Sequence, residues 1–296
     1  MSLWVWATLA AALMQTLRFM LQKQLKGVGL STGGATFSRF LFGAPLAALA
    51  AGATLAALGA PVPLPGLRFW AFALAGGAAQ VAATFLTVAL FSLRNFAVGV
   101  ALTKTEVVQV AAFSALLLGE AVSPWGWLAI GVGFAGVLAL SHRPGGGGLT
   151  SRAALYGVAA GGLFGLSAIG YRGATQELLP LGFFARAIVT LAAVTFAQTL
   201  GMGLYLRLRE PGELRRVGRA WRRTIWVGVT GVAGSAAWFS AFALQNAAYV
   251  RAVGQVEIVF TLAVSVLVFH ERLHPREGLG IALVVASLIG IVALGG

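Results

Sequence analysis

Long apolar segments dominate the pattern of hydrophobic and polar positions along the chain. Each is about 20 residues long or slightly longer, which is enough for an α-helix to cross the ~30 Å hydrocarbon core of a bilayer. Short polar or glycine-rich stretches separate them. We therefore predict ten transmembrane helices, at residues 3–22, 35–58, 69–91, 96–118, 124–141, 153–171, 183–206, 224–245, 248–270 and 275–294.

Composition agrees with an all-α integral membrane protein. Hydrophobic residues make up 59% of the chain and charged residues 10%, with a mean hydropathy of +0.89. A soluble domain has about 25% charged residues, so this chain lacks the polar groups to cover a water-facing surface. It has no cysteine, which excludes disulfides and thiolate metal sites.

Sequence motifs give no sign of an enzyme or of a cofactor. There is no GxxxxGK[ST] nucleotide loop, so we expect no direct use of ATP. The three histidines, His142, His270 and His274, lie at the predicted cytoplasmic rim, so we expect no hydrolase chemistry. The HERLH sequence at 270–274 differs from the HExxH zinc motif. We expect neither catalytic residues, nor a metal, nor a cofactor.

The five-helix pattern occurs twice in the chain. The segment that begins at Asn95 returns at Asn246, and a constant step of 151 positions also relates Trp70 to Trp221, Glu106 to Glu257, Glu120 to Glu271 and Pro124 to Pro275. We predict one repeat at 1–141 and another at 153–296, joined by a flexible glycine-rich linker at 142–152. Because five is odd, the second repeat enters the membrane with opposite polarity, which gives inverted-topology repeats.

Basic residues gather on one predicted side of the membrane, above all in the loop 207–223. Arg39 is counted on that side, and Arg251 is among the few counted on the other. The positive-inside rule then makes the 207–223 loop cytoplasmic and both termini periplasmic in a bacterial inner membrane. The net charge of +13 is thus interpreted as a topology signal and a contact with anionic lipids, not as a nucleic-acid site.

Each repeat places a glutamate inside its apolar fourth helix. Glu106 and Glu257 lie about ten and nine residues into their segments, which puts both roughly 14–15 Å deep, near the bilayer centre. An ionisable residue at that depth is a functional-site hypothesis. Each glutamate could bind a substrate amine or carry a proton. The alternative is a structural ion pair, for Glu106 with Lys104, Arg18 or a residue on a facing helix.

Other polar and aromatic side chains in the apolar segments are further candidates for substrate binding. Arg18 could hold a substrate carboxylate or neutralise a glutamate, the glutamines could bind a polar substrate or bridge helices, and the tryptophan could line a pocket or only pack. These candidates are Gln109, Gln255, Arg18, Lys104, Gln80 and Trp238. We interpret Glu120 and Glu271, at helix ends, as structural.

Two related sequence blocks identify a family resemblance. LLLGEAVSPWGWLAIGVGFAGVLAL at 116–140 and LVFHERLHPREGLGIALVVASLIGIVAL at 267–294 each place a glutamate at the close of the fourth helix and a proline at the start of the fifth. The chain thereby resembles the drug/metabolite transporter superfamily, in its ten-helix form with two EamA-like repeats. The stretch LMQTLRF at 13–19, in the first helix, lacks the tryptophan common in that family. The resemblance implies a secondary carrier whose cavity is lined by helices 1, 3, 4, 6, 8 and 9.

These features together predict a secondary active transporter, by resemblance an exporter, of small polar metabolites such as amino acids. It would work by alternating access, with a small-molecule substrate, the lipid bilayer and protons as its partners. One alternative is a multidrug/proton antiporter for hydrophobic cations. Another is a non-transporting membrane sensor or scaffold, in which the intramembrane glutamates stay permanently paired.

Overall fold

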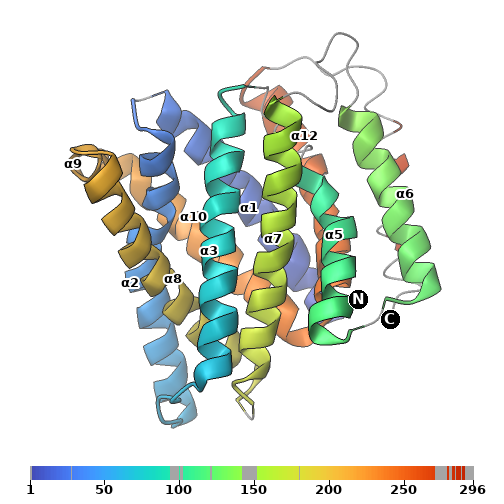
Figure 1. Ribbon diagram of the computed structural model, residues 1–296, viewed down its shortest axis with the longest axis horizontal. Coiled ribbons are helices and arrows are strands. Elements are labelled where there is room, and N and C mark those ends of the chain that lie inside the picture. Colours follow the sequence, from blue (N-terminus) through green and yellow to red (C-terminus); the bar gives the residue numbers. More distant parts are fainter. Residues whose placement is uncertain are drawn as a thin grey trace.

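A computed structural model shows how these segments fold. It describes residues 2–27, 29–93, 100, 103–120, 122–141, 152–179, 181–270, 279, 282–283, 285–287 and 289–290. All regular secondary structure in those ranges is helical, as the sequence predicts (Figure 1).

The helices follow the predicted segments closely. Before the linker lie α1 (Leu3–Lys26), α2 (Thr32–Leu58), α3 (Leu67–Leu90), α5 (Glu106–Phe113) and α6 (Pro124–Ser141). After it lie α7 (Arg152–Gln176), α8 (Phe183–Arg209), α9 (Glu213–Arg219), α10 (Trp221–Leu244), α11 (Ala247–Val253) and α12 (Glu257–Leu267). Short turns of other helix types are η1 (Thr103–Thr105), η2 (Ser114–Leu118) and η3 (Gly254–Val256).

Several of these helices are long and apolar enough to cross a membrane. In the described ranges six qualify, namely Leu3–Lys26, Thr32–Leu58, Leu67–Leu90, Phe183–Arg209, Trp221–Leu244 and Ala247–Leu267. The chain is therefore a multi-pass membrane protein. Ten spans in two inverted repeats stay a prediction, because most of the segment 275–294 and of the linker 142–152 lies outside the described residues.

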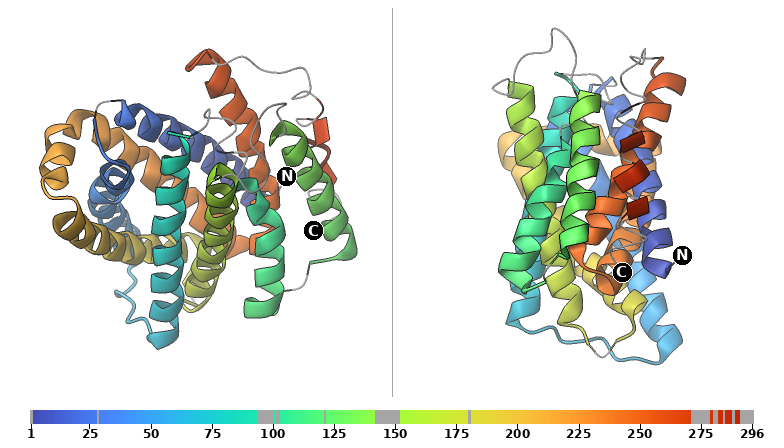
Figure 2. Two further views of the ribbon diagram at one scale, coloured as in Figure 1. Left: turned by 45° about the horizontal axis from the view of Figure 1, so that its top comes forward. Right: turned by 90° about the vertical axis from the view of Figure 1, so that its right-hand side faces the viewer.

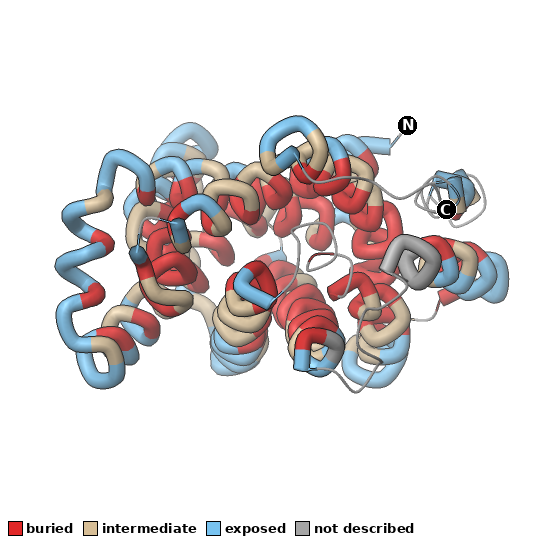
Figure 3. The backbone as a smooth tube through the Cα atoms, turned by 90° about the horizontal axis from the view of Figure 1, so that it is seen from above, coloured by how far each residue is buried: buried red, intermediate tan, exposed pale blue. Residues whose placement is uncertain are grey.

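Helices from the two sequence repeats pack against each other in one bundle. The most extensive contacts join α3 to α7, α1 to α10, and α2 to α8. The long helices lie side by side in Figure 2, and buried positions face the middle of the bundle while exposed positions face outward (Figure 3). Large apolar side chains such as Trp6, Leu49 and Trp226 are exposed on the outside, as suits a surface in contact with lipid.

The α3–α7 crossing is a direct contact between two backbones. A Cβ atom added to Gly170 of α7 would lie 2.7 Å from the Cα of Gly76 and 2.7 Å from the carbonyl oxygen of Phe72, both on α3. Glycines permit such an approach, which is a common way to pack helices in a membrane. The two helices could not lie this close with any larger residue at the crossing.

The basic loop 207–223 contains a short helix, α9, that the hydropathy pattern did not predict. Its first residue, Glu213, is buried, and its carboxylate accepts a hydrogen bond from the backbone N–H of Ser31 at 2.7 Å. Ser31 caps the N-terminus of α2, where the helix dipole favours a negative charge. The loop is thus docked on the bundle through its acidic residue, while Arg215 and Arg219 remain exposed.

Replacement of Gly170 by alanine tests the α3–α7 contact. We expect Gly170→Ala to lower the free energy of unfolding by about 1–3 kcal/mol, since the new methyl group meets backbone atoms that cannot rotate away. Thermal unfolding of the purified protein measures the effect. Gly201→Ala in α8 is the matched control, because a Cβ there has no neighbour within 4 Å. Equal stability of Gly170→Ala and wild type would contradict the contact.

Candidate functional site

Both intramembrane glutamates begin a new helical segment. Glu106 is the first residue of α5 and follows the 3₁₀ turn η1, and Glu257 is the first residue of α12 and follows the 3₁₀ turn η3. The step of 151 positions relates the two turns as well as the two glutamates. Thr105 and Val256, the residues just before the two glutamates, keep right-handed helical backbone angles, so each turn tightens the helix locally and does not end it. The second of the two predicted fourth helices runs as one span over Ala247–Leu267.

Glu257 lies at the centre of a buried hydrogen-bond network. The Lys104 Nζ atom lies 2.6 Å from its Oε2 atom, and the two side chains are 3% and 1% exposed. The Gln15 amide donates to the same oxygen at 2.7 Å, and the indole N–H of Trp238 donates to the Gln15 carbonyl at 3.0 Å. The other carboxylate oxygen of Glu257 is buried and has no hydrogen-bond partner in the described part of the chain.

Glu106 pairs with a different cation. Its Oε1 atom lies 3.6 Å from Nη1 of Arg251, with both side chains 4% exposed. The guanidinium of Arg251 also lies 4.5 Å from the ring centroid of Trp238 and 5.4 Å from that of Phe242. Such cation–π contacts further stabilise a cation that has been removed from water.

The two ion pairs are crossed between the sequence repeats. Lys104 comes from the first repeat and Glu257 from the second, whereas Glu106 comes from the first and Arg251 from the second. Removal of one partner from a buried pair leaves an uncompensated charge at high energetic cost. Each repeat thus depends on the other to neutralise its glutamate.

The structure brings four of the predicted site residues together and directs the three glutamine side chains to other helices. Glu106, Glu257, Lys104 and Trp238 share the network just described, and Arg18 is buried one turn along α1 from Gln15.

The three predicted glutamines contact other helices instead. The side chain of Gln109 packs against Gly162 of α7, and that of Gln255 packs against Gly133 of α6. Gln80 accepts a hydrogen bond from Gln198 of α8 at 3.0 Å. The functional roles of all eight candidates stay predictions.

Gln15 and Arg251 belong to the network, although we did not predict them as site residues. Arg251 was counted as a loop charge outside the membrane, and Arg39 as a loop charge on the cytoplasmic side. Both assignments are wrong, because both side chains are buried among the helices. Arg251 lies near the start of the predicted segment 248–270, and Arg39 lies near the start of 35–58. Close to a segment end, hydropathy alone does not distinguish a charged residue in a loop from one buried in the bundle.

Glu120 has the surroundings expected of a structural residue. Its carboxylate pairs with Arg172 of α7, and a second nitrogen of that guanidinium donates to the carbonyl oxygen of Phe242 in α10. The end of η2 is thus tied to two other helices. The corresponding Glu271 lies outside the described residues.

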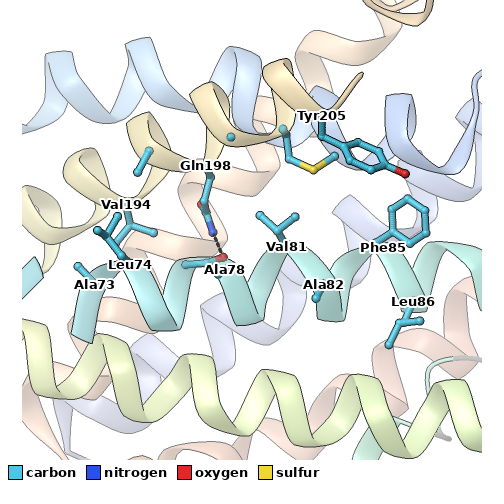
Figure 4. A pocket seen from close by; sticks show the side chains of 14 residues that line it. Ala73, Leu74, Ala78, Val81, Ala82, Phe85, Leu86, Val194, Gln198 and Tyr205 are labelled. Atoms are coloured by element: carbon cyan, nitrogen blue, oxygen red, sulfur yellow. Dashed lines mark hydrogen bonds between the residues drawn. The ribbon is translucent and has the colours of Figure 1, made fainter. Parts of the chain in front are cut away.

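A groove of about 700 Å³ opens between α3 and α8, away from the ion pairs. Figure 4 shows its mostly apolar lining, with Phe85 and Tyr205 at one end and the Gln198 side chain reaching in. The side-chain amide of Gln198 donates hydrogen bonds to the carbonyl oxygen of Gly77 and to the side-chain oxygen of Gln80. Since no charged residue lines this groove, the buried ion pairs are the better candidate for the site of a polar substrate.

Comparisons with known proteins agree with a transporter. Residues 151–293 match the EamA-like transporter family, which supports a membrane transporter of the drug/metabolite superfamily. No curated protein matches the chain. A solved structure titled only "Crystal structure of protein" is 16% identical, with a TM-score of 0.72 over 98% of this chain and 97% of that one. At that identity the likeness concerns the fold alone.

Removal of one charge from the Lys104–Glu257 pair tests whether the two side chains act together. We expect Lys104→Met to destabilise the protein by about 3–5 kcal/mol, because Glu257 is left buried without its cation. The double variant Lys104→Met/Glu257→Gln removes both charges and is expected to regain most of that loss in thermal unfolding.

An exposed ion pair provides the control for this comparison. Arg68 is 80% exposed and lies 3.6 Å from Glu177, so Arg68→Gln is expected to cost less than about 1 kcal/mol. A double variant as unstable as Lys104→Met would show that the two charges are not coupled.

Proposed function

We propose that the protein is a secondary active transporter that exports small polar metabolites, such as amino acids, by alternating access. The observation that carries this proposal is the crossed pairing of Glu106 with Arg251 and of Glu257 with Lys104 in the buried middle of the bundle. The EamA-like match over residues 151–293 supports the transporter class.

The crossed pairs offer a physical basis for alternating access. If the two repeats rock against each other, a pair that joins them must open, and each exposed charge then needs a new partner. A zwitterionic amino acid carries one group for each: its amine for a glutamate and its carboxylate for Lys104 or Arg251. Substrate binding thereby offsets the cost of opening the pair, and a ligand shifts a conformational equilibrium through such differential affinity.

Protons are the proposed coupling ion. A proton that binds Glu257 or Glu106 removes the negative charge that holds Lys104 or Arg251, so protonation weakens the same contacts that the substrate replaces. The carboxylates of Glu106 and Glu257 can then bind protons and substrate alternately, so that proton entry is coupled to substrate exit. Direction, coupling ion and the amino-acid substrate all belong to this proposal.

The proposed orientation places the 207–223 loop in the cytoplasm and both termini in the periplasm. Because the chain has no cysteine, single cysteines introduced at exposed Ser2 and Arg219 report topology directly. We expect a membrane-impermeant thiol reagent to label Ser2→Cys in spheroplasts and Arg219→Cys only in inverted vesicles. The reverse pattern of labelling would overturn the orientation.

Transport in proteoliposomes tests the proposed function. Vesicles loaded with labelled amino acids are assayed with and without an imposed pH gradient, with wild type beside Glu106→Gln and Glu257→Gln. We expect wild type to release substrate in response to the gradient and both variants to lose that efflux while their size-exclusion profiles stay unchanged. Loss of the pH response alone would assign the substituted glutamate to proton coupling.

Other outcomes of this assay favour the alternative functions. Movement of hydrophobic cations instead of amino acids would indicate a multidrug antiporter. If no solute moves and the double variant Glu106→Gln/Glu257→Gln folds as well as wild type, the glutamates are scaffold residues and the transporter proposal fails.

A further inference from the structure

The buried charges of the bundle do not balance. In the described parts of the membrane-spanning segments, four buried side chains are cationic (Arg18, Arg39, Lys104 and Arg251), whereas two are carboxylates (Glu106 and Glu257). The remaining buried carboxylate, Glu213, belongs to α9 and pairs with Arg216. The described part of the interior therefore has an excess of two positive charges.

Arg18 and Arg39 account for this excess. All six glutamates in the described ranges have other polar partners: Glu106 with Arg251, Glu257 with Lys104, Glu120 with Arg172, Glu177 with Arg68, Glu213 with Arg216, and Glu210 with the Ser31 hydroxyl. Neither Arg18 nor Arg39 forms an ion pair with any of them. An arginine side chain stays protonated in proteins, so both charges persist.

The two arginines lie close together, between helices of both repeats. A Cβ atom added to Gly231 of α10 would lie 3.0 Å from Cγ of Arg39 and 3.5 Å from Cδ of Arg18, so Gly231 leaves room for both stems. Arg39 donates to the hydroxyls of Ser235 at 2.9 Å and Thr84 at 3.3 Å. Side chains from α1, α2, α3 and α10 thus meet at one place.

The donors at this place outnumber the acceptors. Arg18 donates through Nη1 to the side-chain oxygen of Gln22 at 2.8 Å, but its Nη2 atom is buried and has no hydrogen-bond partner among the described residues. The partners of both guanidinium groups are neutral oxygens. The aromatic rings of Phe19 and Phe40 lie near them, but cation–π contacts compensate for only part of the cost of burying a charge.

We infer that Arg18 and Arg39 together bind an oxyanion group, a carboxylate or a phosphate, of the transported solute. The planar guanidinium fork fits the two oxygens of such a group. The hydroxyls of Thr84 and Ser235 can donate to the same anion. The inference rests on the proposed transport function and narrows it to solutes with an acidic group, which disfavours hydrophobic cations.

Ligand binding to the purified full-length protein tests the inference. The protein is placed in nanodiscs of neutral phosphatidylcholine, and its thermal midpoint is titrated with succinate, glycerol 3-phosphate, putrescine (a diamine without an oxyanion) or tetraphenylphosphonium. Wild type is compared with Arg18→Gln, Arg39→Gln and the control Arg219→Gln, whose arginine is exposed in α9. Arg18→Lys, which keeps the charge but not the fork, replaces Arg18→Gln if that variant does not fold.

We expect succinate or glycerol 3-phosphate to raise the midpoint of wild type and of Arg219→Gln. Loss of one charge-assisted hydrogen bond should weaken the apparent affinity of Arg39→Gln and of the Arg18 variant by about tenfold or more. The inference is overturned if only putrescine or tetraphenylphosphonium raises the midpoint, if no probe raises it, or if Arg39→Gln responds to anions as wild type does.

A second arm of the experiment separates a solute from a lipid headgroup. The titrations are repeated in nanodiscs that contain phosphatidylglycerol. If this lipid raises the midpoint through the two arginines and no soluble anion does, the site binds lipid and the solute assignment is wrong.

Transport assays then separate failure of the anion site from failure of the proposed function. Normal transport of a neutral or cationic solute by Arg39→Gln would overturn the anion site and leave the transporter intact. Anion binding that depends on both arginines, without transport of any solute, would support the site and overturn the transporter.

Discussion

Charge in an apolar bundle is the constraint on which this structure depends. A carboxylate in the middle of a membrane-spanning helix needs a cation, hydrogen-bond donors or a favourable dipole. Glu257 has the first two, from Lys104 and from Gln15. Glu106 has a cation as well, because it pairs with Arg251.

Crossed pairing also makes the two repeats depend on each other for folding. Lys104 and Glu106 are two residues apart, but their charges are directed to partners in the other repeat. The first repeat alone would hold a buried lysine and a buried glutamate without these partners, and the second alone would hold a buried arginine and a buried glutamate. Because α3 packs along α7 and α1 along α10, the polar pairs and the apolar contacts join the same two parts of the chain.

Sequence patterns located the helices and the two glutamates because hydropathy and a constant spacing depend on local residue type alone. They also indicated Lys104 and Trp238, since a charge or an indole in an apolar segment stands out. They did not give the ion pairs, because the residues next to Glu106 in the sequence do not indicate that Arg251 lies opposite it in the fold. Arg39 and Arg251 were misplaced for a related reason: near a segment end, burial is decided by neighbouring helices. The 3₁₀ turns η1 and η3 were not predicted, because hydropathy over a segment of about 20 residues does not distinguish 3₁₀ from α-helical hydrogen bonding.

The contact between Gly76 and Gly170 has a mechanical consequence. Most helix pairs interlock through side chains, so sliding or turning one helix forces many rotamers to change. Here two backbones touch at Gly76 and Gly170, and the Phe72 ring packs on Gly173 beside them; α3 and α7 belong to different repeats. Side-chain rotamers cannot adjust a contact between two backbones. We therefore expect the middle of α3 and the middle of α7 to move as one unit in any rearrangement of the repeats.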